Sequence, residues 1–372
     1  MSVVELSRLL AEKRVIVVCG AGGVGKTTTS ASLALAAARG GRRVLVITID
    51  PSKRLAQTLG VSPHDPEPRA LPLERQRAVG IEGPGSLTAW MLDPQAVSDR
   101  TVRSLATDPA KADLLLQNRV YRHVTSMVAG MQEYTAVEAL HRFIEDDHYD
   151  LVLLDTPPSR NALRFLDAPS RATAFLDRRV IRLFVPGSHN PIRQVATKMF
   201  ERLLDLAFGS AARAELQQFI VLFEQVLVYL NRNQTEMQRF FASSDVAFLL
   251  VSTPRQEALD EAFYFEEKTR DLSLPLAGYI LNRSRAWAAN RPMPSEELLP
   301  KDASAVARRA LTKLVELAGP EAESARQHEG LREELAVRAG EGFALALPEL
   351  PSGASELESL VVLADRLAAP DT

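Results

Sequence analysis

Apolar residues along this chain occur in two patterns, short unbroken runs and runs with helical spacing, and each pattern predicts one kind of element. Short, unbroken runs of Val, Ile and Leu are typical of strands that are buried on both faces of a parallel sheet. We expect strands at Val15–Cys19, Val44–Ile49, Leu87–Leu92, Leu151–Leu154, Val246–Val251, Ala277–Leu281 and Ala344–Leu347. Helical segments accompany these runs at Lys26–Arg39, Glu257–Arg270 and Glu356–Leu367. The first strand, helix and second strand form a βαβ unit, so the sequence predicts an α/β fold with a mainly parallel sheet flanked by helices.

Longer helical stretches interrupt the strand pattern. Residues 99–143 and 168–242 are helical in their spacing, which predicts an inserted α-helical subdomain. Its strongest apolar stripe consists of Leu216, Phe219, Ile220, Phe223, Val226, Leu227 and Leu230. Ser62–Pro72 is rich in proline and predicts a surface connection, whereas Pro292–Gly340 is charged and rich in Ala, which predicts an exposed pair of helices.

The composition restricts the class of protein. The chain has 372 residues, and its 44 basic and 47 acidic residues give a formal net charge of -3, which argues against binding nucleic acid through a basic surface. Cys19 is the only cysteine, so an internal disulfide and a thiolate metal cage are excluded. No apolar run reaches the ~18 residues of a membrane span, and the first residues do not have the pattern of a signal peptide. We therefore expect a cytoplasmic protein without a membrane span.

The glycine-rich segment Gly20–Thr27 fits two phosphate-binding patterns. As GxGxxG it predicts a dinucleotide site, in which Asp50 at the end of the second strand would hold a ribose hydroxyl. As GxxxxGK[ST] it predicts a P-loop, in which the Lys26 ammonium binds the β- and γ-phosphates and the Thr27 hydroxyl binds Mg²⁺. Only the P-loop uses a Lys-Thr pair directly after the last glycine, so we favour it over a nicotinamide dehydrogenase. The candidate phosphate-binding residues are Gly20, Gly22, Gly23, Val24, Gly25, Lys26, Thr27 and Thr28.

A second motif supports the P-loop interpretation. The apolar run Leu151–Leu154 ends in Asp155, which is the arrangement of a Walker B strand whose carboxylate completes a Mg²⁺ site. Together the two motifs predict an NTPase of the P-loop class. We expect its core at residues 1–98, 143–167, 245–287 and 341–372, the helical subdomain at 99–142 and 168–244, and a charged helical insert at 288–340.

Three segments resemble the arsenical-pump ATPase family, which includes the guided-entry ATPase that carries tail-anchored membrane proteins. They are the loop GAGGVGKTT, the segment Thr48–Ser52, and LLDTPPSRNALRFLDAP at Leu153–Pro169. Looser landmarks are Leu87–Pro94, Gly130–Glu133, Tyr279–Asn282 and Leu347–Gly353. The resemblance is to a bacterial branch of that family and covers most of the chain apart from the charged insert.

The resemblance implies a Mg²⁺-dependent ATPase in which two subunits face each other and bury two ATP molecules between them. It implies that Asp50 lies near the metal and activates the attacking water, so that Asp50 and Lys26 are the catalytic residues. The implied metal ligands are Thr27, Asp50 and Asp155, with Asp155 sensing the γ-phosphate. Asn282 and Pro348 would bind the adenine, since an amide side chain both donates and accepts hydrogen bonds.

The chain departs from the family at the second position of the loop. Ala21 replaces a lysine that reaches across the dimer to the partner's nucleotide. A trans cation of this kind is worth ~10³–10⁵ in rate, so we expect either slow turnover as a homodimer or a heterodimer with a paralogue that keeps the lysine. Lys53 and Arg54 are candidates for a substitute charge. With Cys19 alone, neither the zinc clamp of the targeting branch nor arsenite binding through several thiolates is expected.

The helical subdomain is the candidate partner-binding part of the chain. In the targeting branch such helices form a groove for a client's membrane helix, and the candidate groove residues are Met127, Met131, Met199, Phe219, Phe223 and Val226. The alternative is that these side chains pack in the core. Two other functions stay open: a regulatory nucleotide-binding subunit of a heterodimer, and a positioning ATPase of the ParA/MinD type. The acidic and apolar segment Glu356–Thr372 differs from the basic amphipathic helix of a membrane-binding member.

Overall fold

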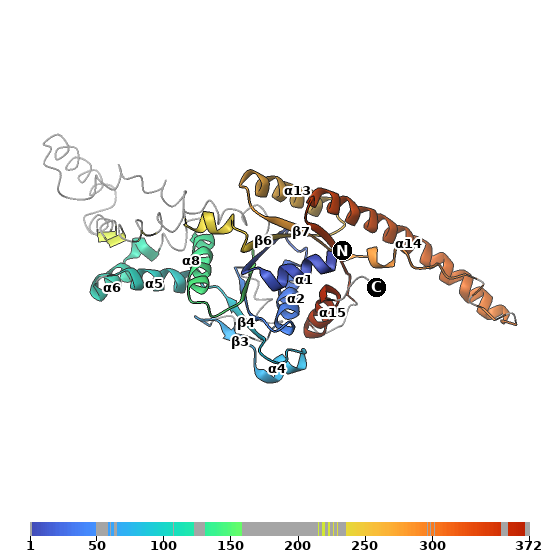
Figure 1. The fold of residues 1–372 in the computed structure, drawn as a ribbon, viewed down its shortest axis with the longest axis horizontal. Coiled ribbons are helices and arrows are strands. Elements are labelled where there is room, and N and C mark those ends of the chain that lie inside the picture. The colour runs from blue at the N-terminus through green and yellow to red at the C-terminus, as the bar shows by residue number, and fades with distance from the viewer. Residues whose placement is uncertain are drawn as a thin grey trace. The chain divides into compact units, whose positions relative to one another are not determined.

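The chain forms two compact units, each built from segments that are distant in the sequence (Figure 1). The sheet unit comprises Met1–Met91, His148–Arg160 and Ala242–Thr372, and the helical unit comprises Leu92–Asp147 and Asn161–Phe241. The computed structural model describes residues 2–49, 59, 61–62, 65–106, 108–122, 131–157, 215, 218–219, 222–223, 226, 229, 236–295, 297, 299–300, 302–350 and 356–368.

The sheet unit is built on one sheet, whose described strands follow the order β3-β4-β2-β5-β1-β6-β7-β8. Neighbouring strands are parallel except for β3, which pairs with β4 in the antiparallel sense. The strands are β1 (Val15–Gly20), β2 (Arg43–Thr48), β3 (Arg69–Ala70), β4 (Ser86–Met91), β5 (Leu151–Asp155), β6 (Val246–Ser252), β7 (Leu276–Ser284) and β8 (Phe343–Pro348). β1, β5 and β6 are buried along their whole length, as unbroken apolar runs require. The expected α/β fold with a mainly parallel sheet is confirmed.

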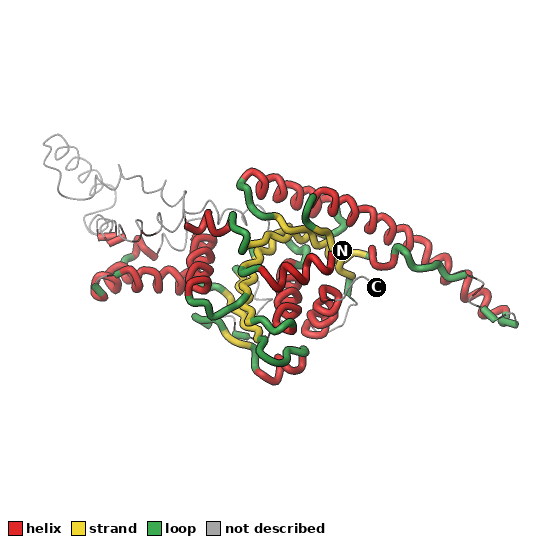
Figure 2. Tube along the Cα trace, viewed as in Figure 1, coloured by secondary structure: helices red, strands yellow, loops and turns green. Residues whose placement is uncertain are grey.

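Helices cover both faces of this sheet, which appears as one curved layer (Figure 2). On one face, α1 (Ser2–Glu12), α2 (Lys26–Arg39) and α15 (Glu356–Ala368) pack together and share a hydrophobic core with alternate residues of the strands. On the other face, α13 (Gln256–Asp271) packs on β6, and α14 (Ala305–Ala339) packs on β7 and β8. The short helices α4 (Leu73–Ala78) and η2 (Ala286–Ala288) also belong to this unit.

The strand order places the glycine loop at the edge of the sheet where ligands bind in such folds. β1 lies between β5 and β6, and β2 lies beyond β5, so the chain leaves β1 on one side and returns to its other side through β6. Ligands of open α/β sheets bind at the carboxyl ends of the strands at such a switch point. The loop follows β1 and ends where α2 begins at Lys26.

The helical unit begins directly after β4. Its described helices include α5 (Pro94–Leu105), α6 (Pro109–Gln117) and α8 (Met131–Glu145). Asp93 and Asp108 cap the first two, since each carboxylate accepts backbone N–H groups of the first turn, at 2.9 Å from Gln95 and 2.9 Å from Ala110. No helix in the described ranges is long and apolar enough to cross a membrane.

The predicted apolar stripe is described only in part. Phe219, Phe223 and Val226 are buried, and the two phenylalanine rings stack with 4.9 Å between their centroids. They share a core cluster with Leu115 and Tyr121. These three candidate groove residues therefore lie in the interior of the helical unit. Leu216, Ile220, Leu227, Leu230, Met127 and Met199 fall outside the described residues, as does the side chain of Met131.

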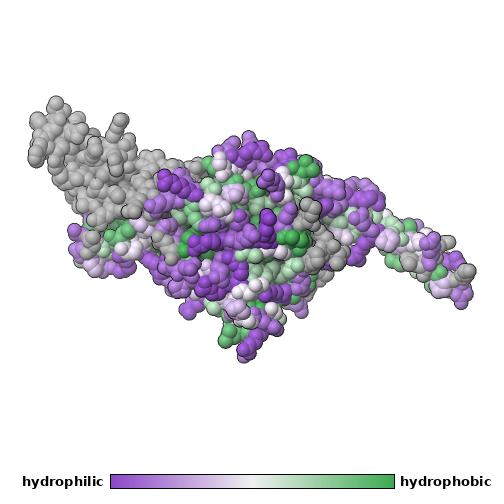
Figure 3. Space-filling model, viewed as in Figure 1, coloured by the Kyte–Doolittle hydropathy of each residue, from purple (hydrophilic) through white to green (hydrophobic). Residues whose placement is uncertain are grey.

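One expectation about the elements is wrong. Pro292–Gly340 does not form a pair of helices, because α14 runs without a break from Ala305 to Ala339 with Pro320 inside it. A proline removes one backbone hydrogen bond and usually interrupts a helix. Gly319, directly before Pro320, also predicts a break, because glycine is unfavourable inside a helix. The helix continues because it packs on β7 and β8, and Ala325 and Leu335 in its second half are fully buried. The expected exposure is found, since most residues of α14 are exposed. Polar and apolar side chains mix along the surface of the helix (Figure 3).

The segment Ser62–Pro72, expected to be a surface connection, contains the strand β3. This strand is two residues long, and both residues are exposed. Such a short strand has no hydrophobic period by which it could be recognised.

Candidate nucleotide-binding site

The loop between β1 and α2 has a backbone that three of its glycines make possible. Gly20, Gly23 and Gly25 have φ values of 151°, 77° and 94°, which side-chain-bearing residues rarely adopt. A Cβ atom at Gly20 would lie 2.1 Å from the Val251 carbonyl oxygen, and one at Gly25 would lie 2.3 Å from the Asn282 Nδ2 atom. Gly22 and Gly23 are exposed at the surface of the loop. The loop is therefore packed tightly on β6 and β7 at its two ends and open between them.

The start of α2 has the properties of an anion site. Gly25 is the N-cap residue, and no side chain caps the first N–H groups of the helix. Uncapped N–H groups at a helix N-terminus, together with the helix dipole, favour a phosphate group. Lys26 is the first helical residue and is only 6% exposed, and its Nζ donates a hydrogen bond to the Ala21 carbonyl oxygen at 2.9 Å. The Lys26 ammonium is thus held across the loop, as the P-loop interpretation requires. Thr28 follows in the first turn of the helix and is half-buried.

The predicted Walker B carboxylate lies next to the predicted metal-binding hydroxyl. Asp155 ends β5 and is fully buried, and its Oδ2 accepts a hydrogen bond from Thr27 Oγ1 at 2.7 Å. The same oxygen accepts a second hydrogen bond, from Thr48 Oγ1 at 2.8 Å. Thr48 is the last residue of β2 and lies opposite Asp155 in the sheet. Two hydroxyl groups and a carboxylate form a set of hard oxygen atoms of the kind that Mg²⁺ prefers, so the residues present fit this metal.

Thr48 belongs to the candidate site through its bond to Asp155, although no motif in the sequence assigns it a role. The segment that contains it was recognised only as part of a family resemblance. The position of Thr48 near the end of a predicted strand could have indicated a role, because polar residues at the carboxyl ends of neighbouring parallel strands meet at one edge of the sheet. Asp50, two residues further along, falls outside the described residues, as do Lys53 and Arg54.

Asn282 and Pro348, expected at the adenine side, come from neighbouring strands. Asn282 lies near the end of β7, and Pro348 ends β8 opposite Ser284. The Asn282 Nδ2 atom donates a hydrogen bond to the Val24 carbonyl oxygen at 2.8 Å, so this side chain contacts the phosphate loop itself. Pro348 is half-buried.

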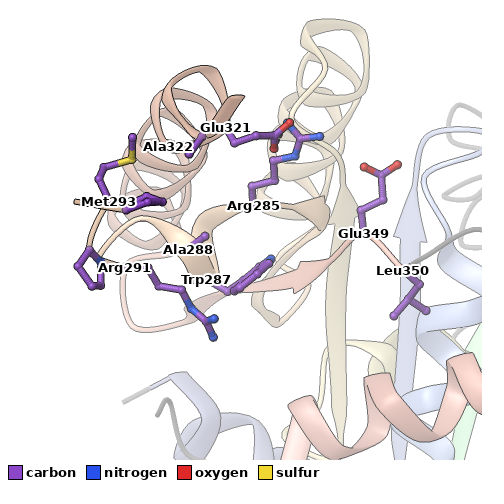
Figure 4. Close-up of a pocket in the computed structure, with 12 residues that line it drawn as sticks. Arg285, Trp287, Ala288, Arg291, Met293, Glu321, Ala322, Glu349 and Leu350 are labelled. Atoms are coloured by element: carbon purple, nitrogen blue, oxygen red, sulfur yellow. Dashed lines mark ion pairs between the residues drawn. The ribbon is translucent and has the colours of Figure 1, made fainter. Parts of the chain in front are cut away.

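A cavity of about 520 Å³ lies just beyond the ends of β7 and β8 (Figure 4). On one side, Arg285 forms an ion pair with Glu321 of α14 at 2.7 Å, and the Arg291 guanidinium stacks on the Trp287 ring at 4.6 Å. Glu349 and Leu350 line it from the segment that follows β8. The cavity therefore continues from the strand ends that carry Asn282 and Pro348. No sequence spacing had indicated Arg285 or Trp287, since neither belongs to a recognisable motif.

Cys19 is not part of the chemistry of the site. The thiol is fully buried in β1, and burial raises its pKa to about 12, against a smaller lowering by a hydrogen bond with Thr156. A thiol with this pKa is neutral at physiological pH and is neither a nucleophile nor a metal ligand. The structure agrees with the expectation that Cys19 is a small core residue.

Comparison with known proteins identifies the family. The sequence profile of the ArsA family, described as anion-transporting ATPases, matches residues 13–282. The chain is 32% identical over 163 residues to ATPase ASNA1 homolog 1 of Paramecium tetraurelia and 30% identical over 177 residues to ATPase GET3 of Kluyveromyces lactis. These matches cover 42% and 44% of this chain and 43% and 48% of the relatives, so the chain matches less than half of their length.

A longer match is found with an uncharacterised protein of Streptomyces coelicolor. It is 29% identical over 293 residues, which are 76% of this chain and 63% of the relative. The family profile spans β1, the glycine loop, β5 and β7 as far as Asn282, and therefore most of the elements that carry the candidate site. The match to the profile of an ATPase family decides against the nicotinamide dehydrogenase interpretation of the loop. The chain belongs to the ArsA family of anion-transporting ATPases.

Proposed function

We propose that this chain is a Mg²⁺-dependent ATPase that hydrolyses ATP at the loop between β1 and α2. The observation that carries the proposal is the contact between Thr27 and Asp155, whose oxygen atoms lie 2.7 Å apart beside the uncapped start of α2. This contact joins the loop to the Walker B strand, and relatives of the chain are named ATPases.

Each residue has a distinct role in the proposal. Lys26 and the N–H groups at the start of α2 bind the phosphates, while Thr27 and Asp155 hold Mg²⁺ directly or through water. When bound, the metal neutralises charge on the β- and γ-phosphates. Asp50 acts as the base that orients the attacking water, following the family resemblance. Asn282 and Pro348 flank the base, and the neighbouring cavity has room for it.

We propose further that the active form is a dimer in the cytoplasm, either of this chain or of this chain with a paralogue. Two sites facing each other would couple the nucleotide state to the fit between the subunits, because the γ-phosphate and Mg²⁺ order the segments near Asp50 and Asp155. This cycle would act on a partner, either a membrane-protein client or a transport partner. The core, helical-subdomain and insert boundaries expected from the sequence remain part of this proposal.

The experiment is ATP turnover with and without Mg²⁺ in wild type, Lys26→Ala and Asp155→Asn. We expect both variants to lose Mg²⁺-dependent turnover. The matched control is Asp150→Asn, at the opposite end of β5, where the carboxylate pairs with Arg43 at 2.6 Å. Asp150→Asn is expected to keep its turnover. Wild-type rates in Asp155→Asn would refute the proposed metal site.

A second candidate function follows from Ala21. Its side chain is almost fully buried, and its carbonyl oxygen is bonded to Lys26, so this position supplies no charge to a facing subunit. The chain would then be a nucleotide-binding regulatory subunit whose active partner carries the lysine. Tight ATP binding without measurable turnover, in a protein that contains Asp50 and Asp155 unchanged, would favour this function.

A further inference from the structure

We propose that Asn282 is a positioning residue for the phosphate loop, acting through the Val24 peptide independently of any contact with the base. The inference rests on the proposed function, since the loop must bind a nucleotide for its position to affect turnover. Asn282 and Val24 are 258 residues apart in the sequence, and the bond between them is 2.8 Å long. Asn282 is only 6% exposed, so the bond is shielded from water.

The backbone of β7 is distorted where it presents this side chain. The pairing of β7 with β8 shifts register between Leu281 and Ser284. Within that interval Arg283 has a φ of 54°, a left-handed conformation that residues with side chains seldom adopt. Bulges of this kind redirect side chains near functional sites, and their strain persists only where the surroundings enforce it.

The orientation of the Asn282 amide is fixed from both ends. Its Oδ1 accepts the backbone N–H of Arg283 at 2.9 Å, while its Nδ2 donates to Val24. A flipped amide would place an N–H group against the Arg283 N–H and an oxygen against the Val24 carbonyl, and both contacts would be repulsive. The bulge and the amide therefore hold one defined donor against the loop.

The bond to Val24 orients the next N–H group of the loop. In a trans peptide the carbonyl of one residue and the N–H of the following residue point in opposite directions. With the Val24 carbonyl directed at Asn282, the Gly25 N–H is directed to the opposite side of the peptide, away from β7. Gly25 also packs so closely on the Nδ2 atom that a Cβ atom there would lie only 2.3 Å away. Asn282 thus fixes the N-cap of α2, where phosphate is expected to bind, before any ligand arrives.

The test compares ligands with and without a base. Affinities for MgATP, MgGTP and Mg²⁺-tripolyphosphate are measured in wild type, Asn282→Ala and Asn282→Asp. We expect Asn282→Ala to weaken Mg²⁺-tripolyphosphate by about tenfold, since this ligand has no base and reports the loop alone, and to weaken MgATP and MgGTP at least as much. Asn282→Asp keeps the acceptor for Arg283 and loses the donor to Val24, and it should weaken binding at least as strongly because it adds a negative charge.

A control separates positioning from general damage to the fold. Ser284→Ala removes one hydrogen bond at the same bulge, which the Ala286 N–H donates to Ser284 Oγ at 3.1 Å, and Ser284 is fully buried. It should leave the three affinities unchanged. Amide hydrogen exchange of Gly20–Lys26 in the ligand-free protein should accelerate in both Asn282 variants and stay unchanged in Ser284→Ala.

The outcomes distinguish this inference from the proposed function. Weakened ATP binding with unchanged tripolyphosphate binding would show that Asn282 acts on the base and would overturn the inference alone. Unchanged loop exchange in the Asn282 variants, or equal losses in Ser284→Ala, would also overturn it. A wild-type protein that binds none of the three ligands would overturn the proposed function, while the exchange experiment would still decide whether Asn282 orders the loop.

Discussion

Oδ2 of Asp155 accepts two hydroxyl hydrogen bonds, from Thr27 at 2.7 Å and from Thr48 at 2.8 Å. A fully buried carboxylate is costly unless hydrogen bonds stabilise its charge. We expect the two threonine hydroxyl groups to behave differently when Mg²⁺ binds. The Thr27 hydroxyl is the one expected to turn to Mg²⁺, whereas Thr48 is fixed in the sheet and can keep its bond to the carboxylate.

We expect Thr48→Val to lower the free energy of unfolding by about 1.5–3 kcal/mol, the usual range for a lost hydrogen bond to a charged group. The shape of the side chain is kept, so the loss reports the hydroxyl. Thr156→Val is the control, because its hydroxyl donates at 2.8 Å to a neutral acceptor, the Val18 carbonyl oxygen, and it should cost less. Urea unfolding of both variants measures the difference. Equal losses would show that Thr48 does not stabilise the charge of Asp155.

Cys19 should make the free energy of unfolding fall at alkaline pH. Burial raises the pKa of this thiol from 9.0 to about 12 in the folded protein. Above pH 9 the unfolded chain releases the thiol proton while the folded chain keeps it, so the unfolded state binds fewer protons and the free energy of unfolding falls as pH rises. Between pH 9 and about 12 the thiol should contribute a loss of roughly 1.4 kcal/mol per pH unit.

The measurement is urea unfolding from pH 8 to pH 10.5 in wild type and Cys19→Ala. The wild-type curve should fall more steeply above pH 9 than the curve of the variant. At pH 8 a thiol reagent should modify Cys19 only as fast as the protein unfolds. Parallel pH curves would mean that the folded thiol ionises as freely as the unfolded one.

At the scale of elements, one buried carboxylate joins two helices and a strand. Glu266 of α13 is 5% exposed and accepts hydrogen bonds from Tyr279 of β7 at 2.8 Å and from Arg338 in the last turn of α14 at 2.9 Å. Arg270 pairs with its other oxygen at 2.6 Å. Burial, and next the contact with Glu266, raise the pKa of Tyr279, so the phenol stays a donor. This cluster secures the C-terminal end of the long helix.

We expect Glu266→Gln to destabilise the protein by about 2 kcal/mol, since it removes the charge that both arginines face. The value is below that for a fully buried pair because the Arg338 side chain is 38% exposed and the Arg270 side chain 73% exposed. Glu323→Gln is the matched control, an exposed glutamate of α14 paired with Arg326, and it should leave the thermal midpoint unchanged. A midpoint for Glu266→Gln equal to wild type would show that the cluster does not stabilise α14.

The elements that the sequence predicted well are those with a strong local period. α2 was expected at Lys26–Arg39 and is found there, because a glycine loop precedes it and glycines follow it. The central strands were found to within a residue or two at each end, since they are apolar throughout. α14 was missed as a single helix because Pro320 is a local signal for a break, while the packing that overrides it is long-range.

At the scale of the whole molecule, the site combines local motifs with contacts that no spacing reveals. Lys26, Thr27 and Asp155 were predicted because each belongs to a motif, and parallel strand ends must meet. Thr48 and the contact of Asn282 with Val24 depend on the register of β2 against β5 and on the bulge in β7. A bulge has no signature in a single sequence, so this half of the site was visible only in the structure.

The proposed dimer predicts that a lysine supplied by a second chain will accelerate hydrolysis. Ala21 is 6% exposed, and its carbonyl oxygen accepts the hydrogen bond of Lys26, so the loop offers no trans cation to a facing copy. A donor chain can be built as Ala21→Lys combined with Lys26→Ala. It carries the trans lysine but lacks the lysine of its own site, so it should be inactive alone.

Mixed with wild type, this donor should raise ATP turnover per wild-type chain by at least about tenfold, because a trans cation stabilises the charge of the transition state. The gain should grow with protein concentration, as expected for assembly of a mixed dimer. Lys26→Ala alone is the control, since it offers the same partner surface without the added lysine and should give no gain. The contrary result is that wild type mixed with the donor turns over ATP no faster than wild type mixed with the control. If the donor chain is folded and forms mixed dimers, this result would rule out catalysis by a facing subunit's loop. Turnover would then depend on charges within the same chain, and Asp50→Asn should abolish it at every concentration.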